Sequence, residues 1–424
     1  MYIRRVRLEN YKGLRHLDFE FERADHSYAG WTVVVGDNAS GKTALLKAIA
    51  GTLIGPDAIR SLQPSFRGWI RRGETEAVMA TELVVGDRDK FWQGRPPEQP
   101  FWSELNLLAA DGPEVVLSSG RKVLKKGKGP MHGPWADNPE GWFSAGYGPF
   151  RRLYGASTEA QRVMSGPSRV ARFATIFRED ATLGECELWL KELHHRKLES
   201  HAREERILDN ILRLLDADFL ENGLSIDRVD SDGLWLQQPN GLRIPLAEMS
   251  DGYRAALAMV VDILRHLVEV YGDNELIATD GPPQVLHQGV VLIDEIDAHL
   301  HPEWQRKIGF WFKNIFPNIQ FIVTTHSPMI CQAADEGSIY RLPSPGSDEE
   351  PCQIRGEEYK RIIASPPDQI LISPAFQLEE IRSPRAVDAR RRYAQLKAKG
   401  AAMALSPQEK KNMQQFELFA CVSD

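Results

Sequence analysis

The chain has 424 residues, of which 26% are charged and 42% hydrophobic, and its formal net charge is −7. This length is too great for one ordinary domain, and the composition is typical of a soluble globular protein. The net acidity excludes a protein that is basic throughout, although local basic patches remain possible.

The four cysteines include no CxxC pair, which argues against a zinc site or a disulfide framework and fits a reducing cytosol. The first residues alternate like a strand and lack the apolar segment of a signal peptide. No apolar run approaches the length of a membrane span. We therefore expect a cytoplasmic protein with no membrane partner.

Two strands open the chain. Residues 2–8 and 16–22 alternate between apolar and charged side chains and are joined through a turn at Gly13. A β-rich run from Trp31 then leads through a glycine-bounded loop into an amphipathic helix. Further strands are expected within residues 76–117.

The glycine-bounded loop matches the pattern GxxxxGK[ST] from Gly36 to Thr43. Backbone N–H groups of such a loop surround the α- and β-phosphates of a nucleotide, Lys42 reaches the β- and γ-phosphates, and the Thr43 hydroxyl binds Mg²⁺. The strand and the helix that this motif requires flank the loop. The predicted nucleotide-binding residues are Gly36, Asp37, Asn38, Ala39, Ser40, Gly41, Lys42, Thr43 and Ala44.

The middle of the chain carries two basic features. Arg121–Lys128 is a basic run that we interpret as a solvated loop in preference to a nucleic-acid contact. The segment WFSAGYGPFRR, from Trp142, is a strand running into a glycine- and proline-containing turn. Arg151 and Arg152 in that turn either contact phosphate or DNA or form salt bridges, and the sequence favours neither.

Residues 182–215 have a helical pattern rich in charge pairs four residues apart, and a short β-hairpin is predicted within residues 224–246. His194, His195 and His201 lie on this charged helix at a spacing that favours a solvated face over a metal site.

A second helix start follows at Ser250, Asp251 and Gly252. Ser-Asp-Gly is a turn and N-cap signal, and the apolar stretch behind it predicts a long helix. The free N–H groups of a capped helix start form an anion site. The chain thus has two candidate phosphate sites.

Two further strands end in polar residues. The run VVLIDEID places Asp294 and Glu295 at the end of an apolar strand, where buried carboxylates are costly unless they have a function. Asp294 is predicted to hold Mg²⁺, and Glu295 to act as the base for the attacking water. The run FIVTTHSP places His326 at another strand end. A lone histidine there is more often structural, but beside a phosphate-binding loop it is a candidate γ-phosphate sensor.

The order of these motifs resembles the ABC-type ATPase heads of the SMC, Rad50 and RecF superfamily. The resemblance implies an α/β P-loop NTPase fold: a mixed β-sheet core flanked by helices, with an N-terminal antiparallel β-subdomain and a helical insertion. It also implies a signature role for Ser250, Asp251 and Gly252, a D-loop at Ala298–His301, and a switch role for His326.

In that family two heads pair head to tail, so that the signature helix start of one subunit caps the γ-phosphate bound by the other. The resemblance therefore implies ATP and Mg²⁺ as cofactors, ATP hydrolysis, and a dimer or higher homo-oligomer. It also suggests four parts: an ATPase lobe with the P-loop at residues 1–178, a helical insertion and β-hairpin at 179–245, a signature, Walker B and switch-histidine lobe at 246–341, and a C-terminal helical extension at 342–424.

Two departures from the family pattern bear on catalysis. No glutamine ends the strand WFSAGYG, where the Q-loop residue is expected, and Gln63 comes too early in the chain to fill the role. The D-loop carries His299 and His301 where small and acidic residues are common.

Three segments, GYGPFRR, EDATLGECELWLKEL and DQILISPAFQLEE, resemble the compact ATPases of bacterial phage-defence operons, such as Septu-type ATPase subunits. This resemblance implies a nucleotide sensor that regulates a separate nuclease subunit, often of the HNH kind, with the helices from Ser383 onward as a docking surface. The alternative is a RecF-like DNA-repair clamp that binds DNA without a nuclease. A transporter subunit is disfavoured because the start is RecF-like and the Q-loop is missing.

Overall fold

The computed structural model describes residues 1–92, 96–109, 115–119, 129–272, 276–278, 282–347 and 349–420. The predicted basic run Arg121–Lys128 lies outside these ranges. Among the described residues, no helix combines the length and the apolar character needed to cross a lipid bilayer.

The central sheet has the strand order β14-β13-β3-β12-β11-β7. Its strands are β3 (Gly30–Val35), β7 (Ser144–Tyr147), β11 (Gly289–Ile293), β12 (Ile319–Thr324), β13 (Ile339–Arg341) and β14 (Cys352–Ile354). All neighbours pair in parallel except β13 and β14. Parallel strands that are covered on both faces are apolar throughout, as β3, β11 and β12 are. The carboxyl ends of β3, β7, β11 and β12 therefore share one edge of the sheet.

A second, antiparallel sheet has the order β2-β1-β4-β5-β6. Its strands are β1 (Tyr2–Tyr11), β2 (Leu14–Glu20), β4 (Glu76–Val84), β5 (Phe101–Ala109) and β6 (Val115–Ser119). The alternation predicted for the first two strands is confirmed: in β2, Leu14, Leu17 and Phe19 are buried, and the charged residues between them are not. One face of this sheet is therefore available for packing.

Helix α1 (Lys42–Ile54) lies between the two sheets. It packs against β4 and β5 of the antiparallel sheet and against β7 and β11 of the central sheet. Nearly all of its residues are buried. The short helix α2 (Pro56–Leu62) follows at a glycine with positive φ, Gly55. The first residues of α1 are consequently held at the carboxyl edge of the central sheet.

The opposite face of the central sheet is covered by α8 (Asp251–Tyr271) and α9 (Pro302–Ile315). Successive residues of β3 divide between the two faces, because side chains alternate along a strand. Val33 and Val35 join the core cluster with α8 and α9, whereas Val34 joins the cluster with α1. The predicted α/β fold class, with a helix-flanked mixed sheet and an antiparallel subdomain, is confirmed.

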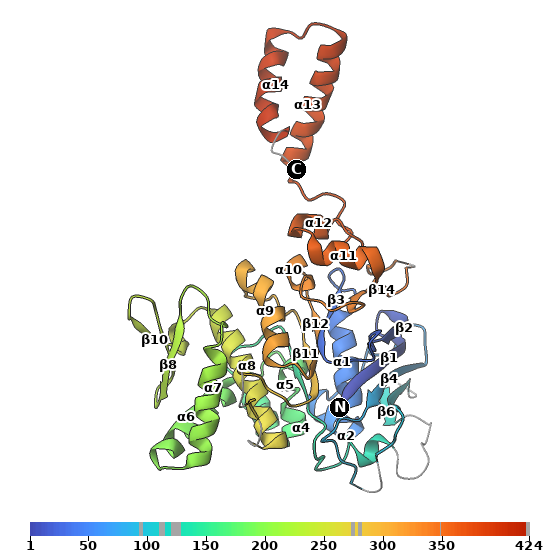
Figure 1. Ribbon diagram of the computed structural model, residues 1–424. Coiled ribbons are helices and arrows are strands. Elements are labelled where there is room, and N and C mark those ends of the chain that lie inside the picture. Colours follow the sequence, from blue (N-terminus) through green and yellow to red (C-terminus); the bar gives the residue numbers. More distant parts are fainter. Residues whose placement is uncertain are drawn as a thin grey trace.

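The segment from β7 to α8 forms the helical insertion. Short helices α3 (Thr158–Met164), α4 (Ser168–Ala171) and α5 (Ala174–Phe177) precede α6 (Gly184–Leu198) and α7 (Ala202–Leu215). The single charged helix expected at 182–215 is therefore wrong: the chain turns at Ser200, whose φ is 67°. A three-stranded sheet follows, built from β8 (Ser225–Asp230), β9 (Gly233–Gln237) and β10 (Arg243–Pro245). Figure 1 shows this insertion and the antiparallel sheet on opposite sides of the central sheet.

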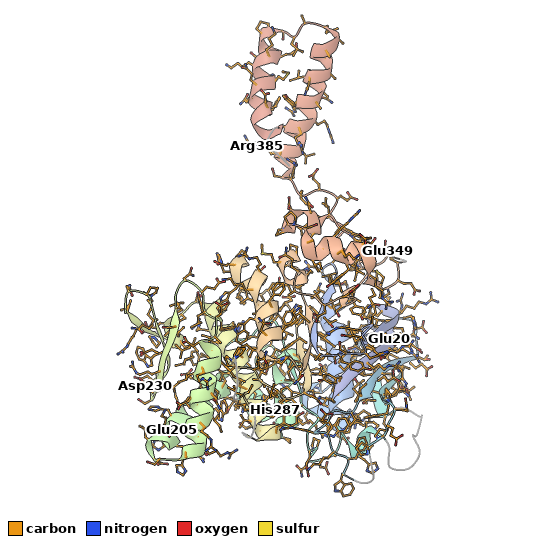
Figure 2. The ribbon with its side chains drawn as sticks, viewed as in Figure 1. Glu20, Glu205, Asp230, His287, Glu349 and Arg385 are labelled. Carbon is orange, nitrogen blue, oxygen red and sulfur yellow. The ribbon has the colours of Figure 1, made fainter. Side chains whose placement is uncertain are left out.

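Two 3₁₀ turns, η1 (Pro130–His132) and η2 (Leu246–Glu248), and five helices complete the fold; the helices are α10 (Pro328–Cys331), α11 (Gly356–Ala364), α12 (Pro367–Leu371), α13 (Pro384–Ala402) and α14 (Pro407–Ala420). The proline- and serine-containing stretch from Leu342 is a loop that connects β13 to β14. Ile362 and Ile370 anchor α11 and α12 in the core. The pair α13 and α14 projects away from the body (Figure 1), and its side chains, with Arg385 near the base, stand outside the packed core (Figure 2).

Candidate nucleotide-binding site

The predicted phosphate-binding loop connects β3 to α1. Its turn depends on positive φ angles: 153° at Gly36, 61° at Ala39 and 102° at Gly41. A β-carbon added at Gly36 would lie 2.7 Å from Ser40 Oγ and 2.9 Å from the carbonyl oxygen of Leu342. Glycine is required at this position for space as well as for conformation.

Lys42 lies inside this loop. Its ammonium group donates hydrogen bonds to the carbonyl oxygens of Gly36 at 2.8 Å and Asp37 at 2.9 Å. Burial lowers the pKa of Lys42, and the nearby carboxylates of Asp294 and Glu295 partly oppose this effect. A cation held there by neutral carbonyl groups is available to an anion that enters the loop.

The Thr43 hydroxyl donates a hydrogen bond to Asp294 Oδ2 at 2.6 Å. The Thr324 hydroxyl, at the end of β12, donates to Asp294 Oδ1 at 2.5 Å. Asp294 is fully buried, and its backbone N–H donates to Tyr147 O at 2.8 Å. The parallel pairing of β11 with β12 thus brings Asp294 beside Thr324, 30 positions away, and the start of α1 brings it beside Thr43, 251 positions away. A hydroxyl and a carboxylate in contact are oxygen ligands of the kind that Mg²⁺ prefers, so these residues fit the predicted ion.

Glu295 lies next to this carboxylate and is half-buried. Its φ of 45° is unusual for a residue with a side chain and costs about 1–3 kcal/mol. Three hydrogen bonds hold its backbone in this conformation, and one of them runs from the Ala298 N–H to the Glu295 carbonyl oxygen at 2.9 Å. Its N–H donates to Thr324 Oγ1 at 2.8 Å, and its carbonyl oxygen accepts from Arg151 Nη2 at 2.9 Å.

The recorded hydrogen bonds of the Arg151 side chain go to backbone carbonyl groups. The side chain is buried, and Nη1 donates to the carbonyl oxygens of Gly148 at 3.0 Å and Asp294 at 2.7 Å. Together with the bond to Glu295, the guanidinium joins the turn after β7 to the end of β11. Burial lowers the pKa of Arg151 to about 10. Arg152 is exposed, and its guanidinium lies 5.7 Å from the centre of the Phe150 ring.

His326 is exposed, two residues beyond the end of β12. Its backbone N–H donates to Asp297 Oδ1 at 3.4 Å, and the same oxygen accepts from Thr325 Oγ1 at 2.5 Å. Asp297 precedes the predicted D-loop. The residue proposed to sense phosphate is therefore tied to the segment that follows Glu295.

The signature residues lie beside the D-loop. Ser250 is the N-cap of α8, but its side chain makes no capping hydrogen bond and is exposed. A β-carbon on Gly252 would lie 2.4 Å from the carbonyl oxygen of His299, whose φ is 65°. This close approach explains why position 252 is a glycine, since a side chain would collide with the His299 carbonyl. An adjoining cavity of about 400 Å³ is lined by Phe150, Arg151, Arg152, Leu153, Tyr154, Asp251, Arg254, Ala255 and His299.

Comparisons with known proteins agree with this geometry. A family model described as "AAA domain, putative AbiEii toxin, Type IV TA system" matches residues 192–331, and a second AAA domain model matches residues 5–79. Septu protein PtuA of Bacillus mycoides (strain KBAB4) is 24% identical over 342 residues, which cover 80% of this chain and 40% of that protein. The predicted resemblance to Septu-type ATPases is confirmed.

A retron Ec83 probable ATPase of Escherichia coli is 39% identical over 117 residues, 28% of this chain and 20% of that protein. The match to this chain thus covers less than half the length of either curated relative. An SMC head bound to the C-winged helix domain of ScpA superposes with a TM-score of 0.47 and 16% identity, over 84% of this chain and 98% of that one. The two AAA matches fall on the segments that contain the loop between β3 and α1 and the ends of β11 and β12.

The candidate Q-loop position, at the end of β7, holds no glutamine. The strand ends at Tyr147, and the next residue is Gly148. Gln63 lies at the end of α2 and donates to Ser65 O at 2.6 Å. Sequence reasoning named the arginine pair after β7 but not the role of Arg151. The signal available was its place, directly after a strand that pairs with β11.

Proposed function

We propose that this protein binds ATP with Mg²⁺, self-associates around it, hydrolyses it, and regulates a separate nuclease in bacterial anti-phage defence. One observation carries the catalytic part of this proposal. The Thr43 hydroxyl contacts Asp294, which is followed by Glu295 in a strained backbone conformation held by three hydrogen bonds. All of these groups lie beside the lysine of the phosphate-binding loop.

Each residue has a distinct task in this mechanism. The loop N–H groups and Lys42 bind the phosphates, and Thr43 with Asp294 holds Mg²⁺, which neutralises phosphate charge. Glu295 accepts a proton from the attacking water. Arg151 and Thr324 act on the backbone of Glu295, and so position its carboxylate without touching the nucleotide.

The signature surface is proposed to complete the site of a second subunit. Ser250 is exposed and its hydroxyl is not used as a cap, so it is free to contact a phosphate from outside the chain. Arg152 lines the adjoining cavity and gives it positive charge, and Arg254 in the same lining pairs with Asp251. A helix start with these neighbours favours an anion, and the terminal phosphate of a neighbour's ATP fits this chemistry.

Glu295→Gln tests the self-association. This variant retains the loop and Mg²⁺ residues but loses the base, so ATP should accumulate in the bound state. We expect ATP to shift its sedimentation to a dimer or larger species, and to do so more strongly than for the wild type. Lys42→Ala is the negative control, and Ser250→Ala in the Glu295→Gln background should weaken association. An identical profile with and without ATP would contradict the proposal.

The defence role rests on the similarity to Septu protein PtuA and to a retron probable ATPase. The docking surface is proposed at α13 and α14, which project from the body. The buried residue of α13 is Ala389. A tagged chain purified from its host, with and without ATP, should bring down a nuclease in fixed ratio. Truncation before Ser383 should abolish this recovery and leave ATP binding intact.

Two outcomes would redirect the proposal. Retained nuclease recovery by the truncated chain would exclude α13 and α14 as the docking surface. Recovery of DNA and self-associated chains alone, with DNA affinity that falls steeply with salt, would favour the RecF-like clamp instead.

A further inference from the structure

Three potential metal ligands converge outside the nucleotide site: Glu221, His301 and Glu303. Glu221 lies between α7 and β8, His301 is the N-cap of α9, and Glu303 is in the first turn of α9. One ligand atom from each residue lies within 4.8 Å of the other two. The helical insertion and the end of the predicted D-loop meet at this point.

The buried member of the cluster has no hydrogen-bond partner for one of its oxygens. Glu221 is 6% exposed, and its Oε1 is buried without a hydrogen bond. The ammonium nitrogen of Lys307 lies 3.6 Å from that oxygen and 3.5 Å from Glu303 Oε1. Both contacts are longer than the about 2.7–2.9 Å of a charge-assisted hydrogen bond. Buried carboxylates are normally paired closely or bound to a metal, so the cluster lacks a cation at close range.

The imidazole is available as a ligand. His301 Nδ1 accepts the backbone N–H of Glu303 at 3.4 Å, which is a long hydrogen bond, and the residue is exposed. The ring can therefore turn a nitrogen toward a cation without breaking a strong interaction. Two carboxylates and one imidazole form a mixed oxygen and nitrogen set, which suits zinc and manganese better than calcium or magnesium.

We propose that Glu221, His301 and Glu303 bind one divalent cation of the zinc and manganese class. Lys307 partly neutralises the carboxylates when the cation is absent, and it can leave because its side chain is 47% exposed. The cation connects the loop before β8 to the start of α9. Trp304, the residue after Glu303, packs against Tyr253 of α8 with ring centres 4.7 Å apart. Binding therefore stiffens the support of the signature helix.

Zinc chloride is the probe for a calorimetric titration of the full chain without nucleotide. All proteins carry Asp294→Asn, so that the nucleotide site does not contribute. We expect one zinc ion per chain, and at least a roughly tenfold loss of affinity in Glu221→Gln, His301→Ala and Glu303→Gln. Zinc should also raise the melting temperature, and His301→Ala should abolish that rise. Because His301 is exposed, this variant is expected to fold.

His201→Ala is the matched control. His201 is also exposed and lies near a carboxylate, with Nε2 3.6 Å from Glu199 Oε2. Its substitution should leave zinc affinity unchanged. Lys307→Gln removes the competing charge and should tighten binding. The proposal is overturned if no stoichiometric zinc binds, if His301→Ala binds zinc as the parent does, or if His201→Ala loses it.

Discussion

Replacing Arg151 with methionine should separate the positioning of Glu295 from the binding of ATP. The guanidinium is buried and donates to the carbonyl oxygens of Gly148, Asp294 and Glu295. Methionine retains most of the apolar volume but supplies no donor. The turn after β7 would then lose its side-chain link to the end of β11, and Glu295 would keep its bonds to Thr324 Oγ1 and to the backbone N–H of Ala298.

The cost in stability follows from these contacts. Three hydrogen bonds from a charged donor contribute roughly 5–9 kcal/mol before desolvation. Burial lowers the pKa of Arg151 from 12.5 to about 10, and a difference of this size offsets about 3 kcal/mol. We therefore expect Arg151→Met to lower the free energy of unfolding by about 2–6 kcal/mol, measured by urea denaturation.

The kinetic consequence is more specific. A displacement of the proposed catalytic carboxylate by about 1 Å can reduce kcat about a hundredfold, whereas the loop and Lys42 would still bind the phosphates. We expect kcat for ATP hydrolysis to fall by this order and the affinity for ATP to change little. Arg152→Met is the matched control, since Arg152 is exposed and should shift stability by less than about 0.5 kcal/mol. Equal losses of kcat and of ATP affinity, or no loss of either, would refute the positioning role.

Three further predictions concern other parts of the chain. Gly252→Ala forces a β-carbon against His299 O, so it should cost about 1–3 kcal/mol of stability in thermal denaturation and weaken ATP-dependent association. Gly13→Ala is the control and should be neutral in the same assay, because a β-carbon there meets open space. Thr43→Val should lower ATP affinity in Mg²⁺ but not in EDTA, and Thr43→Ser should restore it; equal affinities in both buffers would contradict a metal-binding hydroxyl. Burial raises the pKa of Glu269, but the hydrogen bond from His266 and the charges of His266 and Arg265 outweigh it and lower the pKa to about 2. Stability from this group is present above about pH 4.5 and lost as pH falls toward 2, so Glu269→Gln should flatten the acid-side stability curve.

Local patterns predicted the parts of the fold that depend on neighbours in sequence. The alternation in β1 and β2, the glycine spacing of the phosphate-binding loop and the apolar runs of β11 and β12 each reflect the burial of their own residues. The contacts of Asp294 with Thr43 and Thr324 were also within reach, because strands that end in polar residues meet at one edge of a parallel sheet.

Features that depend on pairing across the chain were not predictable. The role of Arg151 requires β7 to lie beside β11, and the cluster of Glu221, His301 and Glu303 spans some 80 positions. The charge pattern of residues 182–215 was misread for a related reason. Lys197 pairs with Asp209 at 2.8 Å, so charges assigned to one helix in fact join α6 to α7 across the turn at Ser200.

The D-loop links the two halves of the proposed mechanism. On one side, Asp297 accepts hydrogen bonds from Thr325 and from the backbone of His326, which connects this segment to the residues after β12. On the other side, His299 O lies against Gly252 at the start of the signature helix. His326, the proposed γ-phosphate sensor, is therefore connected through Asp297 and His299 to the surface that is proposed to contact the neighbouring subunit. The backbone of this path includes two residues in left-handed conformation, Glu295 and His299, which remain so only while the surrounding contacts hold them.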